Sequence, residues 1–84
     1  MIIIEREDLI KAMFSDDYKE RFKAEYYQLV ERRDKLCEIL NQFHSGTLDF
    51  ELACPLILLE NQRAYMDAYL VTLEQRAACE NVEL

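Results

Sequence analysis

The fold of this chain is decided by residues 17–46, which read DYKERFKAEYYQLVERRDKLCEILNQFHSG. Apolar side chains recur here at alternating spacings of four and three residues, the pattern of a helix with a coiled-coil-like seam. The seam positions are Phe22, Tyr26, Leu29, position 33, Leu36, Leu40 and Phe43, and only Arg33 interrupts them. Asp17 with Glu20 three residues later has the form of a capping box, and Gly46 is a typical helix stop. We therefore predict a long helix over about residues 17–44.

A second seam of the same kind lies in residues 55–80, which read PLILLENQRAYMDAYLVTLEQRAACE. Its positions are Leu56, Leu59, position 63, Met66, Leu70, Leu73 and Ala77, and only Arg63 interrupts them. Pro55 suits the start of a helix, because the N–H that it lacks would be unpaired there anyway. If the chain folds back on itself, the numbers of facing seam residues always add to 99, from Phe43 with Leu56 to Phe22 with Ala77. The two seams predict an all-α fold built on a long antiparallel helical hairpin, about 17–44 and 55–80.

The remaining residues extend this single domain, which covers residues 1–84. Residues 1–15 form a variable N-terminal segment, in which Leu9, Ile10, Met13 and Phe14 have helical spacing and predict a short element. A two-helix rod leaves apolar surface outside its seams, namely at Tyr27, Val30, Ile39, Leu58, Tyr65 and Tyr69. We expect a second copy of the chain to cover part of that surface, so that the hairpin packs as an oligomer.

Composition and charge narrow the class of function. The formal net charge is −7, and residues 46–84 hold two basic against seven acidic residues, a net of −5. This charge argues against direct binding of nucleic acid, and it suits a basic protein partner or simple solubility. Cys37, Cys54 and Cys79 are odd in number and widely spaced, which is typical of reduced thiols in a cytosol. No apolar run is long enough for a membrane span, so we expect no membrane partner.

Residues with catalytic or metal-binding potential are few. His44 is the single histidine, and the hydroxyl side chains are scattered along the sequence. A metal site from His44, Asp49 and Cys54 has none of the usual ligand spacings. A single glycine leaves no Gly-rich phosphate loop. We expect a protein that is not an enzyme, with no catalytic residues, no metal and no cofactor.

Arg33 and Arg63 are the main candidates for a binding function, because they fall in adjacent layers of the two seams. A buried guanidinium needs an anion or a route to water. In one interpretation the arginines reach Asp34, Glu60 or Asp67 at the rim and fix the register of the helices. In the other, they hold a phosphate or another anion from a partner, with Tyr65 stacking beside them.

A second candidate cluster lies on the first turns of the helix over 17–44. It consists of Tyr18, Lys19, Arg21 and Lys23, followed by further tyrosines. Basic side chains that alternate with aromatic ones can bind a nucleotide through its phosphate and its base. The same residues also fit a solvated strip balanced by Glu20 and Glu25. Both interpretations remain open from the sequence.

Three stretches of the chain resemble a known family. They are DYKERFKAEYYQL at 17–29, GTLDF at 46–50 with CP at 54–55, and LLENQ at 58–62 with YL at 69–70, LEQRA at 73–77 and the closing ENVEL. Together, over about residues 16–84, they resemble a family of small helical proteins encoded by crAss-like and other tailed bacteriophages and prophages. This resemblance implies a phage accessory protein in the cytoplasm of a bacterial host, without catalytic residues.

The resemblance leads to a functional hypothesis by analogy with other small phage proteins. We expect a non-enzymatic protein that antagonises bacterial antiviral defence by stoichiometric binding, acting as a sponge for a nucleotide immune signal. An acidic inhibitor that binds a host defence protein, as anti-CRISPR proteins do, is the alternative. A structural or regulatory interaction protein of the phage is a third class. A fold of this kind does not distinguish them.

Overall fold

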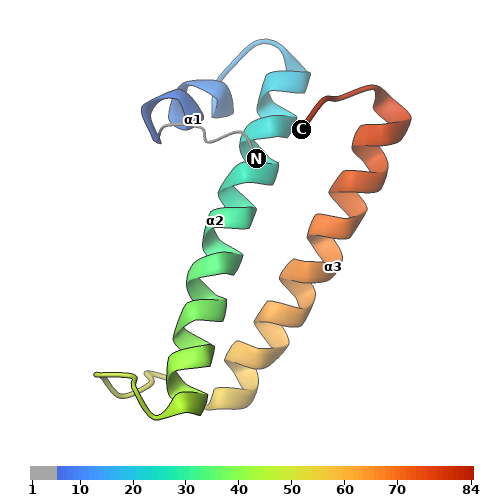
Figure 1. Cartoon of the computed structure of the whole chain (residues 1–84). Helices are drawn as coiled ribbons and strands as arrows, with labels where there is room; N and C mark the ends of the chain where they lie inside the picture. Colours follow the sequence, from blue (N-terminus) through green and yellow to red (C-terminus); the bar gives the residue numbers. More distant parts are fainter. Residues whose placement is uncertain (1–5) are drawn as a thin grey trace.

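The computed structural model describes residues 6–84, and they form three helices: α1 (Arg6–Met13), α2 (Tyr18–Ser45) and α3 (Leu56–Glu80) (Figure 1). Residues 1–5 of the predicted N-terminal segment lie outside the described part. No strand occurs between residues 6 and 84, so the all-α prediction is confirmed there. The two long helices begin and end within one residue of their predicted bounds. None of the helices in this range is long and apolar enough to cross a membrane.

The ends of α2 follow from Asp17 and Gly46. The Asp17 carboxylate accepts a hydrogen bond from the backbone N–H of Lys19 at 2.9 Å, which caps the helix. The second bond of the predicted capping box is replaced, because the Asp17 backbone N–H donates to Ser15 Oγ at 3.1 Å rather than to Glu20. Gly46 has φ 75°, a left-handed conformation that closes the helix, and its N–H donates to the carbonyls of Gln42 and Phe43.

The ends of α3 are set by Pro55 and Asn81. Pro55 is the cap residue before the helix rather than its first residue, and its carbonyl accepts the Leu58 N–H at 3.0 Å. Asn81 ends the helix with φ 57°, the left-handed conformation that asparagine tolerates better than most residues. The chain then turns back, and the Val82 N–H donates to the Ala77 carbonyl at 2.9 Å. This turn returns the last residues to the side of the helix pair.

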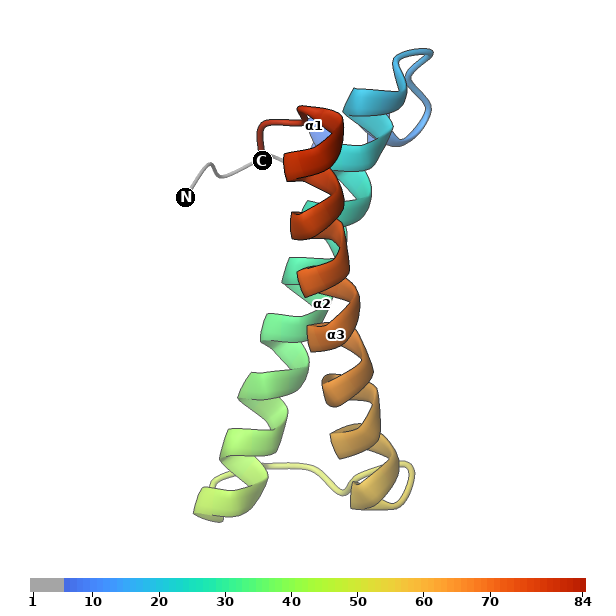
Figure 2. The same ribbon diagram turned by 90° about the vertical axis from the view of Figure 1, so that its right-hand side faces the viewer.

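Helices α2 and α3 lie side by side and run in opposite directions (Figures 1 and 2). Their main core is a buried cluster at the end of the molecule that holds the C-terminus. Its members are Phe22, Leu73, Ala77 and Val82, with Tyr26, Leu29 and Leu84 packed against them. Phe22 with Ala77 and Tyr26 with Leu73 are pairs that the predicted register brings together. In Figure 2 the two helices overlap near this core and separate toward the connection between them.

The core continues more weakly along the molecule, which measures 43 × 26 × 22 Å. Leu40 is almost fully buried and Leu36 is buried, whereas the seam residue Phe43 is 41% exposed. Helix α1 packs against α2 through the buried Leu9, and Arg6 forms an ion pair with Glu31 of α2 at 3.2 Å. The fold is therefore an elongated pair of helices with a short third helix on α2.

Candidate functional site

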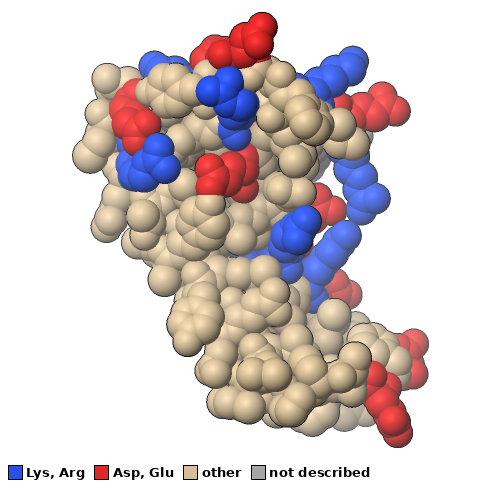
Figure 3. Space-filling view, turned by 180° about the vertical axis from the view of Figure 1, so that it is seen from behind, with Lys and Arg blue, Asp and Glu red and all other residues tan. Residues whose placement is uncertain are grey.

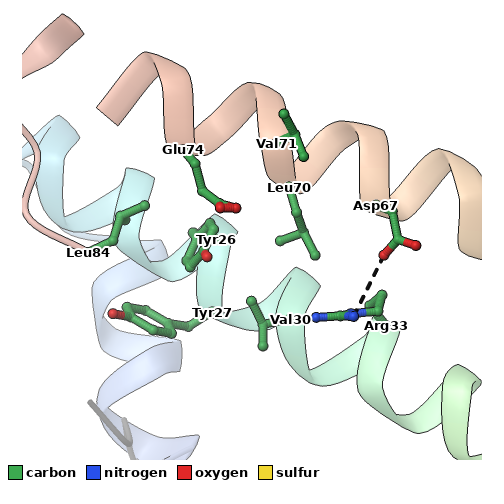
Figure 4. A pocket seen from close by; sticks show the side chains of 9 residues that line it. All are labelled: Tyr26, Tyr27, Val30, Arg33, Asp67, Leu70, Val71, Glu74 and Leu84. Atoms are coloured by element: carbon green, nitrogen blue, oxygen red, sulfur yellow. Dashed lines mark ion pairs between the residues drawn. The ribbon is translucent and has the colours of Figure 1, made fainter. Parts of the chain in front are cut away.

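A half-open groove of about 530 Å³ runs along one side of the α2–α3 pair (Figure 4). Its lining comes from α2, α3 and the C-terminal residue. The lining residues are Tyr26, Tyr27, Val30, Arg33, Asp67, Leu70, Val71, Glu74 and Leu84. On each helix they are spaced by three and four residues, so each helix contributes one face to the groove. The turn after Asn81 brings in Leu84.

One end of the groove is aromatic and apolar. The rings of Tyr26 and Tyr27 meet edge to face, with centroids 5.3 Å apart and an angle of 83° between the planes. Burial raises the pKa of the Tyr26 hydroxyl, and the nearby Glu74 carboxylate raises it further. In Figure 4 the Glu74 carboxylate lies beside Tyr26. The Tyr26 hydroxyl therefore stays protonated at neutral pH and can donate a hydrogen bond.

The other end of the groove is charged and centres on Arg33. Arg33 Nη1 lies 3.7 Å from Asp67 Oδ1, the ion pair dashed in Figure 4, and Arg33 Nε lies 3.2 Å from Asp34 Oδ1. The contact between Nε and Asp34 is an ion pair whose geometry does not meet that of a hydrogen bond. The buried Nε therefore has no hydrogen-bond partner in the protein. The guanidinium therefore meets a carboxylate on two sides, Asp34 at Nε and Asp67 at Nη1.

Asp67 connects the two arginines that interrupt the seams. Its Oδ1 faces Arg33, and its Oδ2 lies 3.9 Å from Arg63 Nε. Arg63 lines a neighbouring hollow of about 290 Å³, together with Leu40, His44, Glu60, Ala64 and Asp67. The structure thus places the predicted pair of arginines on either side of one carboxylate. This agrees with the interpretation in which they reach acidic residues at the rim.

The other predicted site residues lie outside the groove. Tyr65 is 73% exposed and lines neither the groove nor the hollow around Arg63. Lys19 Nζ donates to the Asn81 carbonyl at 3.1 Å, and Arg21 donates to the Ser15 carbonyl. Lys23 lies 3.7 Å from Glu20 in an ion pair, and Tyr18 is 46% exposed. Of the sequence candidates, Arg33 lines the groove, as do Tyr26 and Tyr27, the tyrosines that follow the second cluster. Lys19 joins the start of α2 to the end of α3.

The residues that sequence reasoning missed share a simple signal. Leu70, Val71 and Glu74 lie on or beside the seam of α3, and Val30 flanks the seam of α2. Such flanking positions line any groove between two packed helices. Leu84 had no such signal, because its place depends on the left-handed turn at Asn81.

The groove combines an aromatic surface, one cation and two carboxylates. A planar ring can stack on tyrosine, an anionic group can accept hydrogen bonds from a guanidinium, and hydroxyl or amino groups can donate to carboxylates. Its volume falls within the range of about 300–1,000 Å³ that small-molecule sites occupy. No group of three or more metal-ligating side chains occurs within residues 6–84. The three cysteines are unpaired.

Comparison with known proteins identifies the family. Residues 16–79, well over half of the chain, match the Sequestin family, and the chain belongs to that family. None of the curated proteins and none of the solved structures matches the chain. The match leaves out residues 1–15, which were predicted to be a variable extension, and thus all of α1 lies outside the matched region.

Proposed function

We propose that this protein is a non-enzymatic binding protein that sequesters a nucleotide in the groove between α2 and α3. The observation that carries the proposal is the Arg33 guanidinium, which lines one end of a groove whose other end is formed by the rings of Tyr26 and Tyr27. The family name Sequestin supports a sequestering role. A sponge needs affinity and no chemistry, and the groove offers binding groups rather than a nucleophile with an activating base.

The groove suits the parts of a nucleotide in a definite order. The base stacks on one of the two tyrosine rings and meets the other edge-on, because the rings are nearly perpendicular, and the phosphate accepts hydrogen bonds from Arg33. A ribose hydroxyl or a base amino group donates to Glu74, which lies beside Tyr26 at the aromatic end. Arg33, Asp67 and Glu74 together carry a net charge of −1, which opposes a polyanion. The preferred ligand therefore has few charges, as a phosphodiester has, rather than the charges of a triphosphate.

The biological role follows from the kind of protein that the sequence resembles. Small phage and prophage proteins that remove a nucleotide immune signal prevent activation of the bacterial defence that responds to it. In this proposal the protein acts in the host bacterial cytoplasm and antagonises antiviral defence in proportion to its concentration. Its sequence resemblance to phage proteins and the family name support this role.

A thermal-shift screen tests the proposal. The panel contains adenine and guanine mononucleotides, their triphosphates and cyclic dinucleotides. A ligand that binds only the folded chain raises its melting temperature by mass action. We expect a shift with phosphodiesters, a smaller one with triphosphates, and no shift for Arg33→Ala. The matched control is Arg32→Ala, which removes the same charge from the neighbouring exposed position outside the groove. The absence of a shift with every nucleotide would contradict the proposal.

A second candidate function is supported by the net charge of −7. An acidic protein can block a basic surface of a host defence protein, and such binding weakens as the salt concentration rises. A pull-down from bacterial lysate distinguishes the two functions. Specific, salt-sensitive recovery of one host protein, unchanged by Arg33→Ala, would favour the inhibitor over the sponge.

A further inference from the structure

The charges of α3 are confined to one side of the helix. Between Leu56 and Gln75 its charged residues are Glu60, Arg63, Asp67 and Glu74. All four line the groove or the adjoining hollow around Arg63. The other side of α3 therefore carries no charge over about five turns. This segregation is unusual for an exposed helix surface in a chain in which 32% of the residues are charged.

The uncharged side carries a stripe of large side chains, which we call the tyrosine stripe. It consists of Leu58, Gln62, Tyr65, Tyr69 and Thr72, and Arg76 ends it. These positions are spaced by four and three residues, so they lie along one face of the helix. Leu58 is 55% exposed, Tyr65 73% and Tyr69 44%. Seen from behind in Figure 3, the half of the molecule next to the connection shows a broad surface with charged side chains only at its edge.

We propose that the tyrosine stripe is the interface of a homodimer in which two α3 helices pack antiparallel. The spacings 4-3-4-3-4 read the same in both directions, so a twofold axis near position 67 matches the stripe to itself. Facing residues then have numbers that add to 134. The layers are Leu58 with Arg76, Gln62 with Thr72, and Tyr65 with Tyr69, each occurring twice.

A second copy fits this surface for electrostatic reasons. Two chains of charge −7 repel each other, and the repulsion is weakest where their uncharged faces meet. Two antiparallel copies place four tyrosines at the centre, where aromatic side chains are enriched in interfaces. Gln62 and Thr72 provide a donor and an acceptor for each other. Contact from position 58 to 76 is about 27 Å long.

The ends of the stripe suit the same arrangement. The guanidinium of Arg76 lies 4.9 Å from the centre of the Phe22 ring, and it is held by Glu80, 2.8 Å from Arg76 Nε. Its charge is thereby paired within its own chain, and its aliphatic stem is free to cover Leu58 of the second copy. The groove lies on another side of α3, so the dimer leaves both grooves open. The dimer therefore does not depend on the proposed nucleotide binding.

Sedimentation velocity over a range of concentrations tests the dimer. We expect the wild-type chain to sediment as a dimer and Tyr65→Glu to sediment as a monomer, because one acidic side chain would enter each of the two central layers. The control is Ile10→Glu, which makes the same change at an exposed apolar residue (58% exposed) of α1 and should leave the dimer intact. A monomeric wild-type chain, or a dimer that survives Tyr65→Glu, would overturn the proposal.

A cross-linking experiment tests the register without weakening the interface. Cys37, Cys54 and Cys79 are replaced by alanine, and Gln62→Cys and Thr72→Cys are prepared as separate variants. Under mild oxidation the mixture of the two variants should form a disulfide-linked dimer. Each variant alone should not, since positions 62 of the two chains would lie about 15 Å apart along the axis. Equal cross-linking of one variant alone, or none in the mixture, would contradict this register.

Discussion

Replacing Asp67 by asparagine separates the structural role of the arginine layer from its binding role. The substitution removes the negative charge that lies 3.7 Å from Arg33 and 3.9 Å from Arg63, and it keeps nearly the same shape. If the three side chains form a buried ionic layer that holds α2 and α3 together, the loss of stability is large. If Asp67 serves mainly as an exchangeable counterion, the loss is small and the affinity for phosphate rises.

The structure favours a small loss of stability for Asp67→Asn. Asp67 is 46% exposed, Arg33 33% and Arg63 44%, so water screens both ion pairs. Exposed pairs of this kind contribute about 0–1 kcal/mol each, and we expect the substitution to cost less than about 2 kcal/mol. The groove changes from a net charge of −1 to neutral. Removing one like charge about 4 Å from a phosphate in water is worth roughly 1 kcal/mol, so its affinity should rise about fivefold.

Urea unfolding followed by circular dichroism gives the loss of stability. Calorimetric titration with the best nucleotide of the screen gives the change in affinity. Glu60→Gln is the control, because it removes the same charge from α3 but affects only the His44 pair, at 3.2 Å. A loss above about 3 kcal/mol for Asp67→Asn would show that the layer behaves as a buried ion pair and would refute the reasoning. A nucleotide affinity of Asp67→Asn that falls or stays constant would refute the role of Asp67 as a competing negative charge.

Three further predictions concern stability and follow from single contacts. Leu73→Ala should lower the free energy of unfolding by about 3–5 kcal/mol in urea, since Leu73 is 1% exposed in the main core, and a loss below about 1 kcal/mol would contradict that core. Gly46→Ala should cost about 1 kcal/mol in the same assay, because φ 75° strains an alanine although no atom lies within 4 Å of its Cβ; no loss would contradict the left-handed cap. The pKa of Glu31 is lowered mainly by its hydrogen bond from Lys35, with Arg6 contributing, so its stabilising effect is present above pH 4.5 and is lost as the pH falls through the lower folded-state pKa. The free energy of unfolding of Glu31→Gln should therefore fall less than that of the wild type between neutral pH and pH values below 4.5. An identical pH profile for the two chains would exclude this contribution.

The helices could be predicted from the sequence because their signals are local. The alternation of four and three residues, Asp17 at one end and Gly46 at the other gave bounds within one residue for α2. The details of the caps were harder to predict, since they depend on small differences in loop conformation. Ser15 competes with Glu20 for the Asp17 N–H, and nothing in the local pattern decides between them.

The site was predicted only in part because it depends on how two helices lie against each other. Arg33 was found because it breaks a seam, and Asp67 was named as one of its partners. Tyr65 was associated with the arginines in sequence, yet the structure turns it to another face of α3. The aromatic end with Tyr26 and Leu84 requires both the inclination of the helices and the turn at Asn81, which no spacing rule provides.

The central claim is that the groove between α2 and α3 binds a nucleotide, and chemical-shift mapping by NMR tests it most directly. An isotope-labelled sample of the full chain is titrated with the mononucleotides and cyclic dinucleotides of the screen. The account predicts that saturable shift changes cluster at Tyr26, Tyr27, Val30 and Arg33. Changes confined to residues 18–23 or to the tyrosine stripe, or no saturable changes with any nucleotide, would contradict it.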